Sequence, residues 1–231
     1  MKLTLFSGGA AQAVVTGLQP DFERAHGCTL APTFGAVGAM RDKLLAGEPC
    51  DLLVLSASLI GQLTVQGHVV PGSARALGPV ATGMAVRSDA PAVAVATSEA
   101  LKATLRAARG LYVPDLTKST AGIHIAGMLA ALGLTESLAG RLHEFPNGAT
   151  AMRELARSKG DGLVGCTQVT EILYTPGVRW VGELPAAHAL STVYTAGVCV
   201  RAQQPALAAS FVDALTSESS AALRRASGFG L

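Results

Sequence analysis

Four short turns rich in glycine and other small residues each precede a predicted helix. They lie at residues 7–10, 35–38, 119–122 and 147–150. A helix that begins at such a turn directs its unpaired backbone N–H groups, and the positive end of its dipole, toward one place where an anion can bind. Glycine and alanine also let a ligand approach the backbone closely. The four turns together predict a site for a small anion. The alternative is that glycine merely closes four tight turns.

The order of the predicted elements is typical of an α/β protein. Residues 3–6, 30–34 and 51–55 are apolar strands, and helices at 11–25 and 39–46 separate them. Continuous apolar strands are expected where helices cover both faces of a parallel sheet. A second set of the same kind follows, with strands at 110–113, 142–145 and 162–166 and helices at 120–132 and 149–157.

Two segments carry the chain out of the first set and back, near residues 82 and 190. We therefore expect a discontinuous lobe 1, residues 1–82 plus 190–231, and an inserted lobe 2, residues 83–189. The two crossing segments would form a two-strand hinge. Clefts in open α/β sheets lie at the carboxyl ends of strands, which is where the four turns fall. We expect the ligand in the cleft between the lobes.

Composition excludes several partners. The charged fraction is 15%, yet no apolar run approaches the ~20 residues that a membrane helix needs, so we expect no membrane insertion. A net charge of +2 with dispersed basic residues, and 4% aromatic residues, argues against nucleic acid. The four cysteines are scattered and indicate neither a metal site nor a disulfide framework. We expect no cofactor.

The N-terminus favours a cytoplasmic protein. Met1 and Lys2 lead directly into the first strand, without the apolar region or cleavage site of a signal peptide. The alternative is a periplasmic protein whose signal peptide has been removed and whose Met1 has been restored.

Four segments of the chain together carry a family pattern. They read LFSGG from residue 5, TFGAVGAMR from residue 33, LLAGEPCDLLVLSA from residue 44 and PGVRWVGELP from residue 176. Together they resemble the molybdate-binding proteins of ABC transporters, and the resemblance covers nearly the whole chain. It implies a type II periplasmic-binding-protein fold, a small anionic ligand and, if the protein serves transport, an ABC permease as partner.

Departures from that family's pattern bear on the ligand. Ser7 matches the first serine with which these proteins bind the oxyanion, but Ala36 and Val37 stand where a second serine is usual. No tyrosine follows the strand that ends in Thr167 and Gln168. Each missing hydrogen bond to a dehydrated oxyanion costs about 1–3 kcal/mol. We therefore expect a di- or tricarboxylate, held by backbone donors, rather than molybdate.

A second resemblance suggests catalysis. GIH from residue 122, NGAT from residue 147 and TQVTEI from residue 167 are similar to segments of bacterial aconitate isomerases. This likeness implies an isomerase, allylic or cis-trans, that moves a proton in an unsaturated carboxylic acid. Two alternatives remain, namely a molybdate or oxyanion receptor of an ABC transporter and a ligand sensor without chemistry.

His124 is the candidate catalytic residue. It lies in the first turn of the helix that Ser119 or Thr120 would cap, where the dipole favours a neutral imidazole that can act as a base. The alternative is a histidine packed on a helix face. Glu171 is a weaker candidate for proton transfer, because a carboxylate at a helix start commonly serves only the helix.

The candidate ligand contacts are small or polar residues at strand ends and helix starts. Arg41 is expected either to bind a carboxylate or to pair with an acidic side chain at the surface, and Cys166 lies in a turn where it would meet a ligand. The other four histidines, His26, His68, His143 and His188, are interpreted as structural, with no metal-binding spacing. The full set is Ser7, Gly8, Gly9, Ala36, Val37, Arg41, Ser56, Ser119, Thr120, Asn147, Gly148, Ala149, Thr167, Gln168 and Tyr194.

Overall fold

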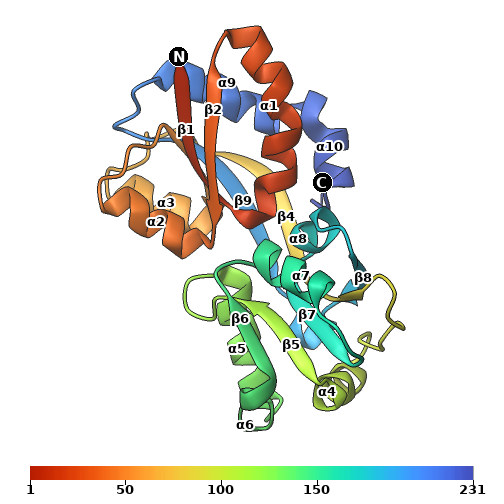
Figure 1. Cartoon of the computed structure of the whole chain (residues 1–231). Helices are drawn as coiled ribbons and strands as arrows, with labels where there is room; N and C mark the ends of the chain where they lie inside the picture. Colours follow the sequence, from red (N-terminus) through yellow and green to blue (C-terminus); the bar gives the residue numbers. More distant parts are fainter. Residues whose placement is uncertain (231) are drawn as a thin grey trace. The chain divides into compact units, whose positions relative to one another are not determined.

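The computed structural model describes residues 1–230, which form two compact units (Figure 1). Of the described residues, unit 1 contains 1–80 and 192–230, and unit 2 contains 81–191. Strands β4 (Arg75–Arg87) and β9 (Ser191–Val198) are the segments in which the chain passes from one unit to the other. Each unit is an α/β structure, as the alternation of elements predicts.

In unit 1, strands β1 (Lys2–Gly8), β2 (Thr29–Gly35) and β3 (Leu52–Ser56) run parallel, in the order β2-β1-β3, and β9 pairs antiparallel with β3. Every residue of β3 is buried, as expected for a strand with both faces covered. The helices are α1 (Gln12–His26), α2 (Val37–Leu45), α3 (Ala57–Val65), α9 (Pro205–Thr216) and α10 (Ala221–Ala226), with short 3₁₀ helices at Gly9–Ala11 and Glu218–Ser220.

In unit 2, strands β5 (Gly110–Pro114), β6 (Leu142–Phe145) and β7 (Leu163–Gln168) run parallel, and β4 pairs antiparallel with β7 and with β8 (Val178–Glu183). The helices are α4 (Ser98–Ala107), α5 (Thr120–Ala131), α6 (Thr135–Leu138), α7 (Gly148–Arg157) and α8 (Val169–Tyr174), with 3₁₀ helices at Ala139–Arg141 and Ala186–His188. Sequence periodicity did not predict α4 and β8.

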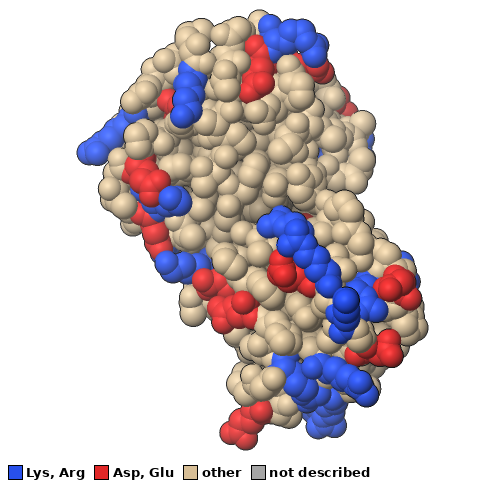
Figure 2. Space-filling view, viewed as in Figure 1, with Lys and Arg blue, Asp and Glu red and all other residues tan. Residues whose placement is uncertain are grey.

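Each unit has its own hydrophobic core. Leu3, Leu53 and Phe211 are fully buried in unit 1, and Leu101 and Ile125 in unit 2. Charged side chains are interspersed over the visible surface, and wide areas of unit 1 carry none (Figure 2). Among the described residues no single helix has the length and apolar character needed to cross a membrane, and one bent pair, Thr120–Ala131 with Thr135–Arg141, meets the criterion only jointly.

A buried carboxylate joins distant segments of unit 1. Oδ2 of Asp51 accepts hydrogen bonds from the backbone N–H and the hydroxyl of Thr4, both at 2.7 Å. Oδ1 accepts from the backbone N–H groups of Gln203 at 2.7 Å and Gln204 at 3.0 Å. Asp51 is only 2% exposed, so these four donors replace its hydration. The carboxylate thereby ties β1 and the start of α9 to the residue that precedes β3.

Replacing Asp51 is expected to destabilise the protein strongly. Asp51→Ala leaves four donors without their acceptor, and we expect the free energy of unfolding to fall by about 3 kcal/mol or more. Urea denaturation followed by circular dichroism measures the change. Asp21→Ala is the control, because Asp21 forms an exposed ion pair with Arg24; its effect should stay within ~0.5 kcal/mol. Equal effects of the two substitutions would contradict the role given to Asp51.

Candidate anion-binding site

The ends of the unit 1 strands bring several predicted residues together. Gly8, at the end of β1, is the partner of Gly35 at the end of β2, and Ser56, at the end of β3, is the partner of Tyr194. A Cβ atom on Gly8 would lie 2.8 Å from Cγ1 of Val37 and 2.9 Å from Cε1 of Tyr194. A larger residue at position 8 would therefore force the side chain of Val37 or Tyr194 to shift, which favours glycine here.

The helices that start at this edge differ in whether a capping side chain accepts hydrogen bonds from the backbone N–H groups of their first turns. Ser56 caps α3, because its Oγ accepts from the backbone N–H of Leu59 at 3.5 Å. Ala36, the N-cap residue of α2, forms no such side-chain bond. The first turn of α2 thus lacks a side-chain acceptor from its own cap, which is the condition for binding an anion at a helix start.

Three further unit 1 residues have defined partners. Ser7 is fully buried and its hydroxyl donates to the carbonyl of Gly8 at 2.9 Å, so it does not cap α1. The ring of Tyr194 is 3% exposed and contacts Phe229 edge-on, with centroids 6.4 Å apart. Arg41 forms an ion pair with Asp42 at 2.7 Å, the surface role of the two expected for it.

In unit 2 the parallel strands β5, β6 and β7 end at a common edge, and the three helices that follow them begin there. Ser119 caps α5 by accepting from the N–H of Gly122 at 3.4 Å, and Asn147 caps α7 by accepting from the N–H of Thr150 at 2.9 Å. A Cβ atom on Gly122 would lie 2.0 Å from the carbonyl oxygen of Asp115. Only glycine lets the first turn of α5 approach the backbone so closely.

The start of α7 already holds a carboxylate, that of Glu171. The backbone N–H groups of Gly148, Ala149 and Gln168 donate to this carboxylate, and the hydroxyl of Thr167 donates to its Oε2 at 2.5 Å. A Cβ atom on Gly148 would lie 1.9 Å from the same Oε2. Four of the residues predicted to contact a ligand therefore donate to Glu171, a side chain of the protein itself. They are Gly148, Ala149, Thr167 and Gln168.

Burial dominates the electrostatics of Glu171. The side chain is enclosed, and loss of hydration raises its pKa above the ordinary value. The hydrogen bonds from Thr167 and from the three backbone N–H groups oppose that shift without reversing it. Glu171 thus holds a proton to higher pH than an exposed glutamate does. The sequence motif that contains it indicated a helix-start carboxylate, but not which helix it would serve.

His124 is oriented by a main-chain contact. Its Nε2 lies 2.7 Å from the carbonyl oxygen of His188, and the side chain is partly buried in α5. Because a carbonyl only accepts, Nε2 carries the proton in this contact, and a neutral ring then has its lone pair on Nδ1. Thr120 is the first residue of the same helix. The contact with the carbonyl of His188 thus favours the tautomer of His124 in which Nδ1 is free to accept a proton.

The expectation that Cys166 meets a ligand is wrong. The residue is fully buried in β7, and burial raises the pKa of its thiol to about 12. A buried, protonated thiol is a packing group rather than a ligand contact. Within residues 1–230 no three His, Cys, Asp or Glu side chains are grouped closely enough to hold a metal ion.

Comparison with known proteins defines the family. Residues 3–230 match the bacterial extracellular solute-binding protein family. The chain belongs to this family. It is 27% identical over 228 residues to an aconitate isomerase from Pseudomonas sp, covering 95% of this chain and 84% of that relative.

Solved structures confirm the fold of this family member. A periplasmic molybdate-binding protein from Azotobacter vinelandii is 18% identical and superposes with a TM-score of 0.80, covering 99% of each chain. A sulfate-binding protein from Mycobacterium tuberculosis is 16% identical, with a TM-score of 0.77 over 99% of this chain and 86% of that one. The predicted type II periplasmic-binding-protein fold is therefore correct.

The buried Glu171 predicts a pH dependence of stability. A carboxyl group whose pKa is raised in the folded state contributes stability that is fully present below its unfolded value of about 4.5 and is lost as pH rises through the folded value. Relative to Glu171→Gln, which cannot titrate, the wild-type protein should lose stability as pH rises above 4.5. Urea denaturation across pH 4–8 measures this difference.

Glu154→Gln serves as the control for that series, because Glu154 pairs with Arg157 at the surface of α7. This variant should follow the wild-type pH dependence. A constant difference between the wild-type protein and Glu171→Gln across the series would mean that burial does not shift the titration of Glu171.

Proposed function

We propose that this protein binds a small di- or tricarboxylate at its helix starts and moves a proton within an unsaturated acid, as an isomerase. The proposal rests mainly on one observation, namely that the side chain of Glu171 already occupies the start of α7. A tetrahedral dianion needs many donors at once, yet the N–H groups of Gly148 and Ala149 already serve a carboxylate. A planar carboxylate needs fewer donors, and the first turn of α2 offers them.

The proposed ligand contacts in unit 1 are Ser7, Gly8, Gly9 and the backbone N–H groups at Ala36 and Val37. Binding would turn the Ser7 hydroxyl from the carbonyl of Gly8 toward the ligand. The serine missing at Ala36 and Val37, and the tyrosine missing after the strand that ends in Gln168, support the same conclusion. Without those hydroxyls an oxyanion loses bonds that each contribute about 1–3 kcal/mol.

The proposed chemistry uses groups of unit 2. An allylic shift needs a base near a carbon-bound proton, and donors that stabilise the enolate-like charge. His124, with its lone pair on Nδ1, is the proposed base, and Glu171 is a second group that holds a proton inside the protein. The similarity to an aconitate isomerase from Pseudomonas sp, at 27% identity, supports this reaction class.

A second candidate function is a receptor for molybdate or a related oxyanion that delivers it to an ABC permease. The family, and the structural similarity to a molybdate-binding protein, favour this function. A binding protein without chemistry, acting as a sensor, is a variant of it. The isomerase is proposed to act in the cytoplasm and the receptor in the periplasm, so cell fractionation with a compartment marker separates the two.

Ligand binding distinguishes the candidates directly. We expect aconitate, citrate or a related polycarboxylate to raise the melting temperature, because a ligand at 100 times its Kd adds about 2.7 kcal/mol to stability. Molybdate, tungstate and sulfate should cause little change. Thermal shift followed by calorimetry measures both effects. Micromolar or tighter molybdate binding would instead support the receptor.

Proton transfer is tested by solvent deuterium exchange into bound aconitate, followed by NMR. We expect His124→Ala to lower the exchange rate by about 10²–10⁴ while affinity changes only modestly. His188→Ala is the matched control, because His188 contacts His124 through its main-chain carbonyl, which the substitution retains. If the unmutated protein binds aconitate without any exchange, the protein is not an isomerase of this acid.

A further inference from the structure

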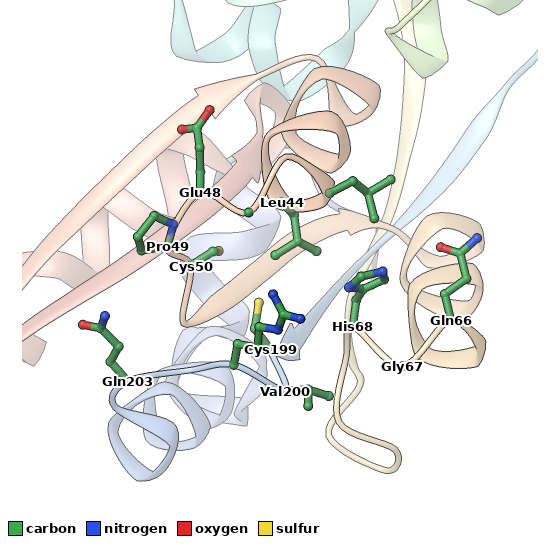
Figure 3. A pocket seen from close by; sticks show the side chains of 13 residues that line it. Leu44, Glu48, Pro49, Cys50, Gln66, Gly67, His68, Cys199, Val200 and Gln203 are labelled. Atoms are coloured by element: carbon green, nitrogen blue, oxygen red, sulfur yellow. The ribbon is translucent and has the colours of Figure 1, made fainter.

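Unit 1 contains a pocket at the amino end of β3, whereas the proposed ligand contacts lie at its carboxyl end. The cavity has a volume of about 500 Å³ and is lined by residues from three segments, which precede β3, follow α3 and follow β9 (Figure 3). Two cysteines line it, Cys50 from the first segment and Cys199 from the third. His68 and Arg201 line it as well.

The two cysteines are held side by side by the backbone. Leu52 and Val198 are partners in the antiparallel pair of β3 and β9, and the N–H of Cys199 donates to the carbonyl of Asp51 at 2.8 Å. Cys50 immediately precedes Asp51 in the chain. The pairing of the two segments therefore places the backbones of Cys50 and Cys199 close to each other.

The thiols are also linked to each other. The Cys50 thiol donates to the carbonyl of Leu52 at 3.0 Å, and the Cys199 and Cys50 side chains are hydrogen bonded. Since the Cys50 proton points to Leu52, Cys199 is the donor to the Cys50 sulfur. Neither cysteine forms a disulfide in this structure. Oxidation of the pair would replace this contact by an S–S bond of about 2.05 Å.

We propose that Cys50 and Cys199 are a redox-active dithiol that a small disulfide, bearing carboxylates and entering through this pocket, oxidises to an intramolecular disulfide. The residues that line the pocket indicate which class of oxidant it would accept. Arg201 and His68 offer basic groups to the carboxylates of the oxidant. Glu48, the acidic residue of the lining, is engaged by Lys43, with 2.9 Å between Nζ and each carboxylate oxygen.

The reaction proceeds in two exchange steps. The thiolate of Cys50 attacks the oxidant, forms a mixed disulfide and releases one small thiol. Cys199 then loses its proton and attacks the Cys50 sulfur, which forms the protein disulfide and releases the second small thiol. Two electrons and two protons pass from the protein to the oxidant. The hydrogen bond to Cys50, burial and the nearby Asp51 raise the pKa of Cys199, so Cys50 begins the sequence.

The product would connect the two chain portions that build unit 1. Residues 50 and 199 lie on either side of the inserted unit 2, residues 81–191. A cross-link that closes so long a loop removes many conformations from the unfolded chain. We therefore expect the oxidised protein to melt at a higher temperature than the reduced protein.

The test uses the native full-length protein and oxidised glutathione as probe. After incubation, free thiols are alkylated in denaturant, and intact mass and peptide mapping are recorded. We expect two of the four cysteines to be alkylated and the other two to form a Cys50–Cys199 disulfide. Cys199→Ser should stop at a glutathione adduct on Cys50. Cys28→Ser and Cys166→Ser should still form the disulfide: all four cysteines are buried, but only Cys50 and Cys199 line this pocket.

Two outcomes would overturn the proposal. One is alkylation of all four cysteines after prolonged incubation of a folded, reduced protein, which would leave the pair as a packing feature. The other is a disulfide that involves Cys28 or Cys166, which would indicate oxidation of an unfolded population. Circular dichroism of each variant shows that it is folded before oxidation begins. None of these results depends on which ligand the protein binds at the other end of the strands.

Discussion

Parallel strands end at one edge of a sheet, and each must then turn into a helix whose first backbone N–H groups need acceptors. This constraint acts in both units of the protein. β1, β2 and β3 in unit 1, and β5, β6 and β7 in unit 2, end in this way. Since a helix start without an acceptor attracts anions, the constraint creates the binding capacity of the fold before any ligand-specific side chain is considered.

The helices differ in which groups accept hydrogen bonds from the backbone N–H groups of their first turns. Ser56, Ser119 and Asn147 cap α3, α5 and α7 with their own side chains, while Ala36 provides no such cap to α2. Glu171 adds its carboxyl group at the start of α7, where three backbone N–H groups and Thr167 donate to it. A carboxyl group of the protein that already occupies one helix start restricts which anions the protein accommodates. The family alone does not decide this, because its fold is compatible with several oxyanions.

The rest of unit 1 is stabilised by interactions remote from these helix starts. Asp51 connects β1 with the start of α9 through four hydrogen bonds, and Cys199 donates its N–H to the carbonyl of Asp51. The segment that precedes β3 therefore supplies both the buried carboxylate that links distant segments of unit 1 and one of the two thiols that line the pocket. The opposite end of β3, at Ser56, pairs with Tyr194. A single buried strand thus has different sets of neighbouring residues at its two ends.

The sequence by itself determined the α/β class, the succession of most strands and helices, and the family, because these depend on local periodicity, turn residues and motifs. It also located the small residues at helix starts, since glycine is required wherever backbones approach closely, as at Gly122 against Asp115. Only the tertiary structure decided that Glu171 occupies the start of α7, that Cys166 is buried, and that Cys50 lies beside Cys199. Such contacts join residues far apart in the chain or on different elements. They depend on strand order and side-chain burial, which local sequence patterns do not encode.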